Sequence, residues 1–336
     1  MRTRYLGTTG VQLSILGFGT MLFGGPVDRS DAAAIYARCR DAGINHFDCA
    51  DVYNAGRAEQ VLGELSAGHR DEVIITSKAY FPTRADPNAR GASRRHLLRS
   101  VERSLERLGT DRIDIFYVHR SDEHTASEDT LRALDDLVRQ GKILYPALSN
   151  FSAWQAARML GHAERLGLAK PVCVQPMYNL AKRQAEVEIL PMAAAERLGV
   201  LPYNPLGGGL LAGKYGRERK PERGRLVDNA MYSPRYGAAS NFEIAERFVA
   251  LAKELGHHPA TLALAWVASH PAVTAPLLGA RSLEQLEPLL AAAELELDAE
   301  TRAKISALSP EPPPATDRNE ERSAHNYAAK TESQRA

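Results

Sequence analysis

The sequence predicts a single (β/α)8 TIM barrel, in which eight parallel strands form a cylinder inside a ring of helices. Eight short apolar runs recur along the chain, and amphipathic helical patterns lie between most of them. Most runs are about 30 residues apart, which is the length of one unit of strand and helix. Eight such units in 336 residues favour a closed barrel over an open doubly wound sheet.

The repeat begins after a short N-terminal segment. Gly7 and Gly10 punctuate this segment and predict a β-hairpin ahead of the barrel. Clear helical patterns cover 58–65, 97–108 and 130–141. The eight strands are expected within 14–20, 43–48, 72–78, 113–119, 143–150, 172–176, 199–205 and 273–280.

Two segments depart from the repeat. Residues 205–242, after the seventh run, are rich in Gly, Pro and Arg and predict a long lid or binding loop, with disorder as the alternative. Residues 309–336 are Pro-rich and then polar, which predicts an appended mobile tail of which a short piece could dock. We therefore expect a barrel domain at 1–308 and a tail at 309–336.

Composition restricts the partners. The chain has 42 basic and 41 acidic residues and a formal charge of +1, so no overall field attracts nucleic acid or anionic lipid. The N-terminus lacks the apolar core of a signal peptide, and no stretch approaches the roughly 20 apolar residues that span a bilayer. We expect a cytoplasmic protein with a small-molecule partner and no nucleic-acid or membrane partner; homo-oligomerisation is left open.

The three cysteines, Cys39, Cys49 and Cys173, have no CxxC spacing and are expected to be reduced thiols. Cys49 lies next to Asp48, but no His flanks it. A buried thiol is therefore favoured over a nucleophile there.

Three consecutive apolar runs end on titratable residues. The second ends on Asp48, the third on Lys78 and the fourth on His119. Strands of a barrel end at one common mouth, so we expect these three side chains to meet there, with Tyr53 on the loop after Asp48. Structural ion pairs or helix caps would be the alternative for any one of them.

The four residues suit proton donation to an oxygen. A tyrosine ordinarily has a pKa near 10, and the Lys78 cation is expected to lower the pKa of Tyr53. Asp48 would keep Lys78 charged, and His119 would orient the oxygen that Tyr53 protonates. Such an oxygen gains negative charge when a carbonyl carbon receives hydride.

Several ordered motifs carry a resemblance that extends from "RYLGTTGVQLSILGFGTMLFGG" to "LELDAETRAKISAL". They are "FDCADVYN", "TSK", "VHR", "SNF", "VQPMYN", "YNPLGGGLLAGKY" and "GARSLEQL". The chain resembles the aldo-keto reductase superfamily in all of them. The resemblance implies a catalytic tetrad of Asp48, Tyr53, Lys78 and His119, with Tyr53 as the general acid, and NADPH-dependent reduction of an aldehyde or ketone by direct hydride transfer.

The resemblance also implies a binding site for NADP(H). Ser149, Asn150 and Gln175 would hold the nicotinamide carboxamide, and Tyr203 would stack on the ring. Arg281 suggests a preference for NADPH, because its guanidinium can grip the 2′-phosphate. The other expected cofactor residues are Gly19, Thr20, Met21, Asn204, Leu206, Gly208, Lys214, Gly279 and Gln285.

The chain departs from the family pattern at four positions. Asn54 replaces a usual Gly, Asn204 a frequent Ser, and Pro288 with Leu289 a Glu and Asn that usually reach the adenine. Loss of two hydrogen bonds to the adenine is expected to weaken cofactor binding. The stretch "HRSDEH" lacks the Trp or Pro common after the histidine, so the shape of the substrate cannot be inferred from it.

Three alternative functions have some support in the sequence. Some superfamily members are potassium channel β-subunits, so a cofactor-binding regulatory module is the main alternative to an enzyme. The stretch "GGLLAGKY" nearly fits a phosphate-binding loop, but Tyr215 stands where a small hydroxyl must bind magnesium. His119, Asp122 and His124 have no recognised zinc spacing, so no metal is expected.

Overall fold

The computed structural model describes residues 1–219, 221–222 and 224–323. Its centre is an eight-stranded parallel sheet in the order β10-β3-β4-β5-β6-β7-β8-β9. Each strand overlaps one of the eight predicted runs. The strands are β3 (Gly17–Gly19), β4 (His46–Asp48), β5 (Ile74–Ala79), β6 (Ile113–Val118), β7 (Ile143–Ser149), β8 (Cys173–Gln175), β9 (Gly199–Val200) and β10 (Leu277–Leu278).

Backbone hydrogen bonds also join the two ends of this sheet. The N–H of Thr274 donates to the carbonyl of Val200 at 2.8 Å, and the N–H of Leu277 donates to that of Pro202 at 2.9 Å. The ring of strands therefore closes, and the predicted barrel is confirmed.

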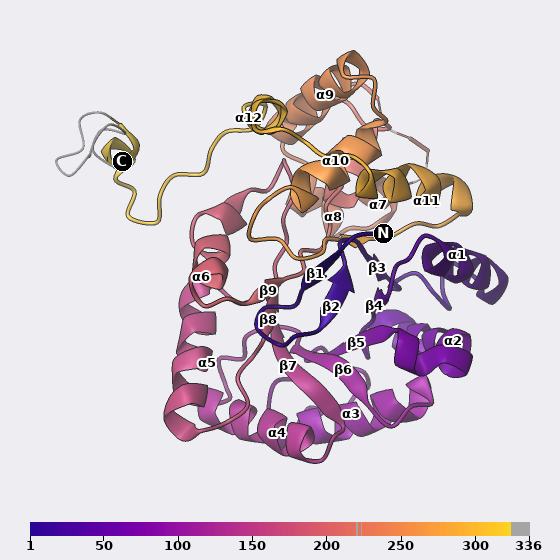
Figure 1. The fold of residues 1–336 in the computed structure, drawn as a ribbon, viewed down its shortest axis with the longest axis vertical. Helices are drawn as coiled ribbons and strands as arrows, with labels where there is room; N and C mark the ends of the chain where they lie inside the picture. Colours follow the sequence, from indigo (N-terminus) through magenta and orange to yellow (C-terminus); the bar gives the residue numbers. More distant parts are fainter. Residues whose placement is uncertain (220, 223, 324–336) are drawn as a thin grey trace.

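The predicted hairpin is present as β1 (Thr3–Tyr5) and β2 (Gln12–Ser14), paired antiparallel. Leu6 and Leu13 are fully buried and pack with Ile115 and Tyr117. Figure 1 shows the hairpin in front of the centre of the ring of strands. Because β2 leads directly into β3, the hairpin covers the end of the barrel where strands begin and leaves the opposite mouth free.

Helices surround the strands (Figure 1), and α3 (Arg94–Leu108) shows why the sequence places them there. The Ser93 side chain accepts a hydrogen bond from the N–H of His96 at the helix start. Buried residues recur at Leu97, Val101 and Leu105, so one face packs inward. The helix ends at Gly109, with φ of 60°. The other helices of the barrel body are α1 (Arg29–Asp41), α2 (Arg57–Ser66), α4 (Ser127–Arg139), α5 (Ala153–Leu166), α6 (Ile189–Ala195), α9 (Ala239–Glu254), α10 (Pro259–Ala268), α11 (Leu283–Leu290) and α12 (Ala299–Ser306).

Short 3-10 turns occur in several of the connections. They are η1 (Tyr53–Gly56), η2 (Ala67–Glu72), η3 (Gln184–Glu186), η4 (Gly207–Ala212), η5 (Ala291–Ala293) and η6 (Asn319–Arg322).

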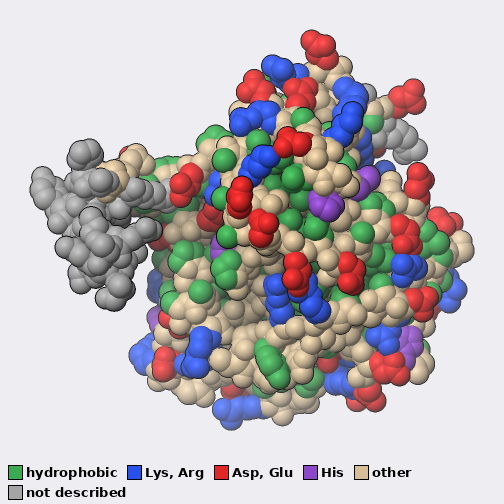
Figure 2. All heavy atoms as spheres, turned by 45° about the horizontal axis from the view of Figure 1, so that its top comes forward, with side chains coloured by type: hydrophobic (Ala, Val, Ile, Leu, Met, Phe, Trp, Pro, Cys, Tyr) green, Lys and Arg blue, Asp and Glu red, His purple; other side chains and the backbone are tan. Residues whose placement is uncertain are grey.

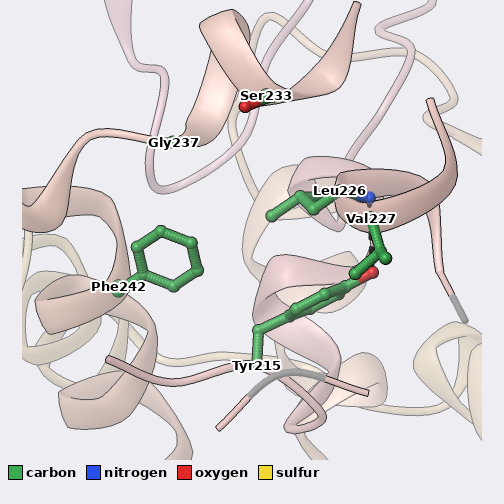
Figure 3. Close-up of a pocket in the computed structure, with 6 residues that line it drawn as sticks. All are labelled: Tyr215, Leu226, Val227, Ser233, Gly237 and Phe242. Atoms are coloured by element: carbon green, nitrogen blue, oxygen red, sulfur yellow. Dashed lines mark hydrogen bonds between the residues drawn. The ribbon is translucent and has the colours of Figure 1, made fainter. Parts of the chain in front are cut away.

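The insertion at 205–242 has more regular structure than its composition predicts. After η4 it contains α7 (Arg225–Asp228) and α8 (Tyr232–Tyr236). Buried tyrosines, including Tyr215 and Tyr236, anchor its described residues, which argues against the alternative of disorder. A cavity of about 220 Å³ lies within the insertion, where Phe242 faces Tyr215 and Leu226 (Figure 3).

The chain remains attached to the barrel body as far as Ser309. Arg183 Nη1 donates to the carbonyls of Ser306 and Ser309 at 3.0 and 3.2 Å. Beyond this point an irregular segment leads away from the barrel to η6 (Figure 1). The domain boundary at residue 308 stays a prediction, and the predicted tail beyond residue 323 lies outside the described residues.

The distribution of charge on the described surface agrees with the nearly equal numbers of acidic and basic residues in the sequence. Figure 2 shows acidic and basic side chains intermixed over one face of the molecule. Within the described residues, no helix combines the length and the apolar composition needed to cross a bilayer.

Candidate active site

A buried ion pair lies at the barrel mouth. Lys78 Nζ is 2.5 Å from Asp48 Oδ2 and also donates to the carbonyl of Cys49 at 2.7 Å. Asp48 Oδ1 accepts from Thr76 Oγ1 at 2.7 Å and from Gln175 Nε2 at 2.9 Å. Asp48 is 3% exposed and Lys78 is 0% exposed. Burial is the largest single influence and opposes charge on both groups. The attraction between the two charges, together with their hydrogen bonds and other neighbouring groups, outweighs it, so the pKa of Asp48 is lowered and that of Lys78 is raised.

Tyr53 lies beside this pair, as predicted. Lys78 Nζ is 5.1 Å from the centroid of the Tyr53 ring. Burial raises the pKa of Tyr53 to about 12, although Lys78 acts in the opposite direction. Lys78 therefore lowers the pKa of Tyr53 as predicted, but the cost of burying a phenolate is larger and sets the direction of the overall shift. Tyr53 holds its proton at neutral pH and can act as an acid.

His119 completes the predicted group and is neutral. It is 8% exposed, and burial together with Lys78 lowers its pKa to about 3. Its ring meets the ring of Tyr53 edge-on at 6.1 Å between centroids. Among the described residues, its buried Nδ1 has no hydrogen-bond partner.

The turn that carries Tyr53 explains the departure at Asn54. Asn54 and Ala55 have φ of 49° and 57°, in the left-handed region that Asn adopts more readily than most residues. Asn54 Nδ2 donates to the carbonyls of Met21 and Phe23 at 3.0 and 2.7 Å. The amide thus fastens the Tyr53 turn to the loop after β3, which a glycine could not do.

The predicted nicotinamide residues come together on the next strand ends. Ser149 Oγ donates to the carbonyl of Gln175 at 3.1 Å. Tyr203 Oη donates to Asn150 Oδ1 at 2.8 Å, and Asn150 Nδ2 donates to the carbonyl of His119 at 3.0 Å. Because Gln175 also contacts Asp48, one hydrogen-bonded network links this pocket to the buried ion pair.

Asn204 holds the glycine-rich loop after β9. Its Oδ1 accepts from the N–H of Gly208 at 2.7 Å, and its Nδ2 donates to Tyr236 Oη at 2.6 Å. Gly208 has φ of 71°, and a Cβ there would lie 2.7 Å from the Tyr232 ring. The Leu206 carbonyl accepts from the N–H of Gly209 at 3.0 Å, so Leu206 and Gly208 are both held by contacts inside this loop. The Asn204 side chain is likewise engaged within the loop.

Three cationic side chains, those of Lys214, Arg225 and Arg281, interact electrostatically near the start of α11. Partial burial, then Arg281 and then Arg225, lower the pKa of Lys214. Across the described residues, neither Lys214 nor Arg281 has a carboxylate within ion-pair distance. Sequence reasoning missed Arg225. Arg217, another arginine of the same insertion, is not part of this group, because it pairs with Glu246 at 2.9 Å.

The remaining predicted cofactor residues lie in two places, at strand ends beside the ion pair and around helix α11. Thr20 Oγ1 donates to the Asp48 carbonyl at 2.9 Å, and a Cβ on Gly279 would lie 3.7 Å from the Gly19 carbonyl, so these strand ends lie beside the ion pair. Gln285 Oε1 accepts from the N–H of Arg281 at 3.2 Å. Leu289 is 2% exposed and belongs to the hydrophobic core, so it presents no surface for the base. Weak adenine binding stays a prediction.

Two residues of the alternative sites, Asp122 and Cys49, do not form part of a reactive site here. Asp122 accepts hydrogen bonds from the N–H groups of Ala92 and His124 at 2.7 and 3.0 Å, which shapes its loop. No cluster of three metal-ligating side chains occurs within the described ranges. Cys49 is fully buried, and burial raises the pKa of its thiol well above the ordinary value, so it is a poor nucleophile.

The sequence pattern of the Aldo/keto reductase family matches residues 15–310. The chain belongs to this family. The relatives of this aldo/keto reductase include "Uncharacterized oxidoreductase YrpG" of Bacillus subtilis (strain 168), 36% identical over 93% of this chain and 97% of the relative. A "Probable voltage-gated potassium channel subunit beta" of Arabidopsis thaliana is 34% identical over 88% of this chain and 92% of its own. "L-glyceraldehyde 3-phosphate reductase" of Escherichia coli O157:H7 is 35% identical over 85% and 86% of the two chains.

Asp51 is a further buried carboxyl of this aldo/keto reductase that sequence reasoning passed over. It is 2% exposed, and within the described chain neither of its oxygens has a hydrogen-bond partner. Burial, and then the neighbouring Glu59, raise the pKa of Asp51 to about 8, while Arg107 opposes them. Arg107 is already hydrogen-bonded to Glu59 at 2.6 Å. The sequence indicated this second carboxyl, because the motif "FDCADVY" contains Asp51 as well as Asp48.

We expect Asp51→Asn to alter stability in a pH-dependent way. The folded pKa of about 8 lies above the ordinary value of 3.8, so the native state keeps a proton that the unfolded state has lost. The wild type should therefore lose stability as pH rises through this window, on the order of several kcal/mol, and the variant should not. Urea unfolding at pH 5 and pH 8 measures this.

The exposed carboxyl of Asp71 provides the control, because Asp71→Asn should leave the pH dependence as in the wild type. An equal difference between Asp51→Asn and wild type at both pH values would show that Asp51 does not hold a proton.

Proposed function

We propose that this aldo/keto reductase uses NADPH to reduce an aldehyde or ketone to the alcohol. One observation carries the proposal: Tyr53, which holds its proton, lies beside neutral His119 and the buried pair of Lys78 and Asp48. Tyr53 can donate a proton and His119 a hydrogen bond from a ring N–H to the same substrate oxygen. The Lys78 cation lies close enough to stabilise negative charge there.

The residues present fit a nicotinamide dinucleotide phosphate. Ser149, Asn150 and Gln175 provide hydroxyl and amide groups for a carboxamide, and Tyr203 provides a ring for stacking. Lys214, Arg225 and Arg281 are a donor set suited to a phosphate.

When bound, a reduced nicotinamide supplies hydride to the carbonyl carbon. Tyr53 Oη then gives its proton to the carbonyl oxygen, which completes the alcohol and leaves a phenolate. Lys78 stabilises this phenolate until water returns the proton, and Asp48 keeps Lys78 charged. His119, being neutral, has one ring N–H to donate to the same oxygen and so orients the carbonyl.

The experiment is a panel of aldehydes and ketones assayed with NADPH, in which the loss of cofactor absorbance reports turnover. Reduction of any member supports the proposal. Tight cofactor binding without turnover of any carbonyl would instead favour a regulatory module, as the name of the Arabidopsis relative suggests for that protein.

The cation group gives a prediction about the cofactor. Arg281→Ala should raise the KM for NADPH about 10-fold and leave that for NADH unchanged, because only NADPH carries the 2′-phosphate. Steady-state kinetics with each cofactor measures the change. Arg217→Ala is the matched control, since Arg217 is paired with Glu246. If Arg281→Ala retains the wild-type ratio of the KM for NADPH to the KM for NADH, Arg281 does not bind the 2′-phosphate.

A further inference from the structure

The turn that carries Tyr53 has an unusual backbone conformation. The three residues after Tyr53 have φ of 49°, 57° and 88°, so all of them lie in the left-handed region; they are Asn54, Ala55 and Gly56. Ala55 has no intrinsic preference for this region, and such strain persists only where surrounding contacts enforce it. The position of the Tyr53 side chain therefore depends on the contacts that hold residues 54–56.

The contacts that hold this turn come from the loop after β3. Asn54 Nδ2 donates to the carbonyls of Met21 and Phe23 at 3.0 and 2.7 Å. Among the described residues, no other hydrogen bond joins residues 54–56 to a segment outside 50–60. The Asn54 amide is therefore the polar link between the turn and this side of the mouth.

The loop after β3 is shaped to receive the Asn54 amide. A Cβ on Gly25 would lie 2.5 Å from Asn54 Oδ1 and 2.7 Å from Asn54 Nδ2, which is too close for any real side chain. A Cβ on Gly24 would lie 2.9 Å from the Cβ of Arg57, the first residue after the turn. The two glycines thus allow the loop to approach the turn closely.

The same loop is anchored to β4 independently of Asn54. The N–H and Oγ1 of Thr20 donate to the carbonyl of Asp48 at 2.8 and 2.9 Å. The N–H of Phe23 donates to the carbonyl of Thr20 at 2.9 Å. A chain of hydrogen bonds therefore runs from the Asp48 backbone through this loop to Asn54, so the loop can act as a fixed support for the Tyr53 turn.

We propose that Asn54 is a positioning residue for carbonyl reduction: by joining the Tyr53 turn to the loop after β3, it holds the Tyr53 hydroxyl where the carbonyl oxygen receives its proton. The inference rests on the proposed function. A proton donor must lie within hydrogen-bond reach of its acceptor, and a displacement of about 1 Å can cost on the order of 10²-fold in rate. Asparagine suits this position because it tolerates a left-handed backbone and brings two N–H donors.

Asn54→Gly should lower kcat about 10-fold, because glycine keeps the left-handed backbone but lacks the two donors. The KM for the carbonyl compound and the Kd for NADPH should stay within about threefold, since Thr20 keeps its hydrogen bonds to Asp48. Asn54→Asp should lower kcat at least as much, because a carboxylate of the same shape cannot donate to a carbonyl. Steady-state kinetics with a carbonyl compound that the wild type reduces, and fluorescence titration with NADPH, measure these values.

Gly25→Ala tests the same contact from the other side. In the wild type the added methyl group would displace the Asn54 amide, so kcat should fall by a similar factor. In the Asn54→Gly background the methyl group no longer meets that amide, so Gly25→Ala should change kcat by less than about twofold. The kcat values of these four proteins measure the coupling between the two residues.

A solvent isotope effect distinguishes a positioning role from a merely structural one. The solvent deuterium isotope effect on single-turnover reduction should rise in Asn54→Gly, because transfer of the exchangeable Tyr53 proton becomes slower relative to hydride transfer. Arg197→Gly is the matched control. Arg197 also has a left-handed φ, of 53°, but it precedes β9 at the opposite end of the barrel, so this variant should change neither kcat nor the isotope effect.

The outcomes separate this inference from the proposed function. If the wild type reduces no carbonyl compound, the proposed function is wrong and the inference fails with it. If the wild type reduces a carbonyl compound, the reductase activity stands, and three results would each overturn the role of Asn54. These are a kcat of Asn54→Gly within about twofold of wild type, an unchanged isotope effect in that variant, and an equal effect of Gly25→Ala in both backgrounds.

Discussion

Tyr53→Phe is expected to abolish carbonyl reduction while the protein still binds NADPH. The substitution removes only the hydroxyl that we propose as the proton donor, and general acid catalysis typically contributes about 10² to 10⁴ in rate. The ring and its edge-on contact with His119 remain, so the mouth keeps its shape. Single-turnover reduction of an active aldehyde measures the loss.

Cofactor titration by fluorescence is the control for this variant, because no cofactor contact is assigned to the Tyr53 hydroxyl. Activity of Tyr53→Phe within threefold of wild type would show that another group, or water, provides the proton.

The second large effect is expected at the buried ion pair. Lys78→Met leaves the Asp48 carboxylate buried without its cation, and Asp48→Asn leaves the Lys78 ammonium without its anion. Each change should destabilise the fold by about 3–5 kcal/mol, and each should reduce kcat through Tyr53. The double variant should lose much less stability and activity than the sum of the two, because no unpaired charge remains.

Urea unfolding and kcat measured on all four proteins of this cycle test the coupling. The exposed pair of Arg38 and Glu287 provides a matched cycle, for which we expect a coupling of about 0–1 kcal/mol. Additive losses at Lys78 and Asp48 would refute the view that they act as one unit.

The proximity of the proposed catalytic residues could be predicted from the sequence because their placement follows from a repeat. Parallel strands of similar length end at one edge, so residues that close consecutive apolar runs meet in space. In the structure β4, β5 and β6 are neighbours, and Asp48, Lys78 and His119 lie at or next to their ends. Nothing beyond strand order was needed to bring them together.

Contacts that depend on irregular backbone could not be predicted in this way. Helices α7 and α8 have four and five residues, too short for a periodic pattern, and packing of Tyr232 on Gly208 holds them in place. For the same reason Arg225, rather than Arg217, joins the cation group. The high pKa of Asp51 depends on burial beside Glu59, which the sequence does not show.

The closure of the barrel has a consequence for how the chain is made. Strand β3 pairs on one side with β4, which follows it closely, and on the other with β10, where Gly17 is opposite Leu277. A ribosome must therefore release nearly the whole chain before the first barrel strand obtains its second neighbour. Until then one edge of the nascent sheet remains open to pairing with other chains, which favours aggregation. Chaperone dependence during synthesis should accordingly be relieved only when the segment around residue 277 has emerged.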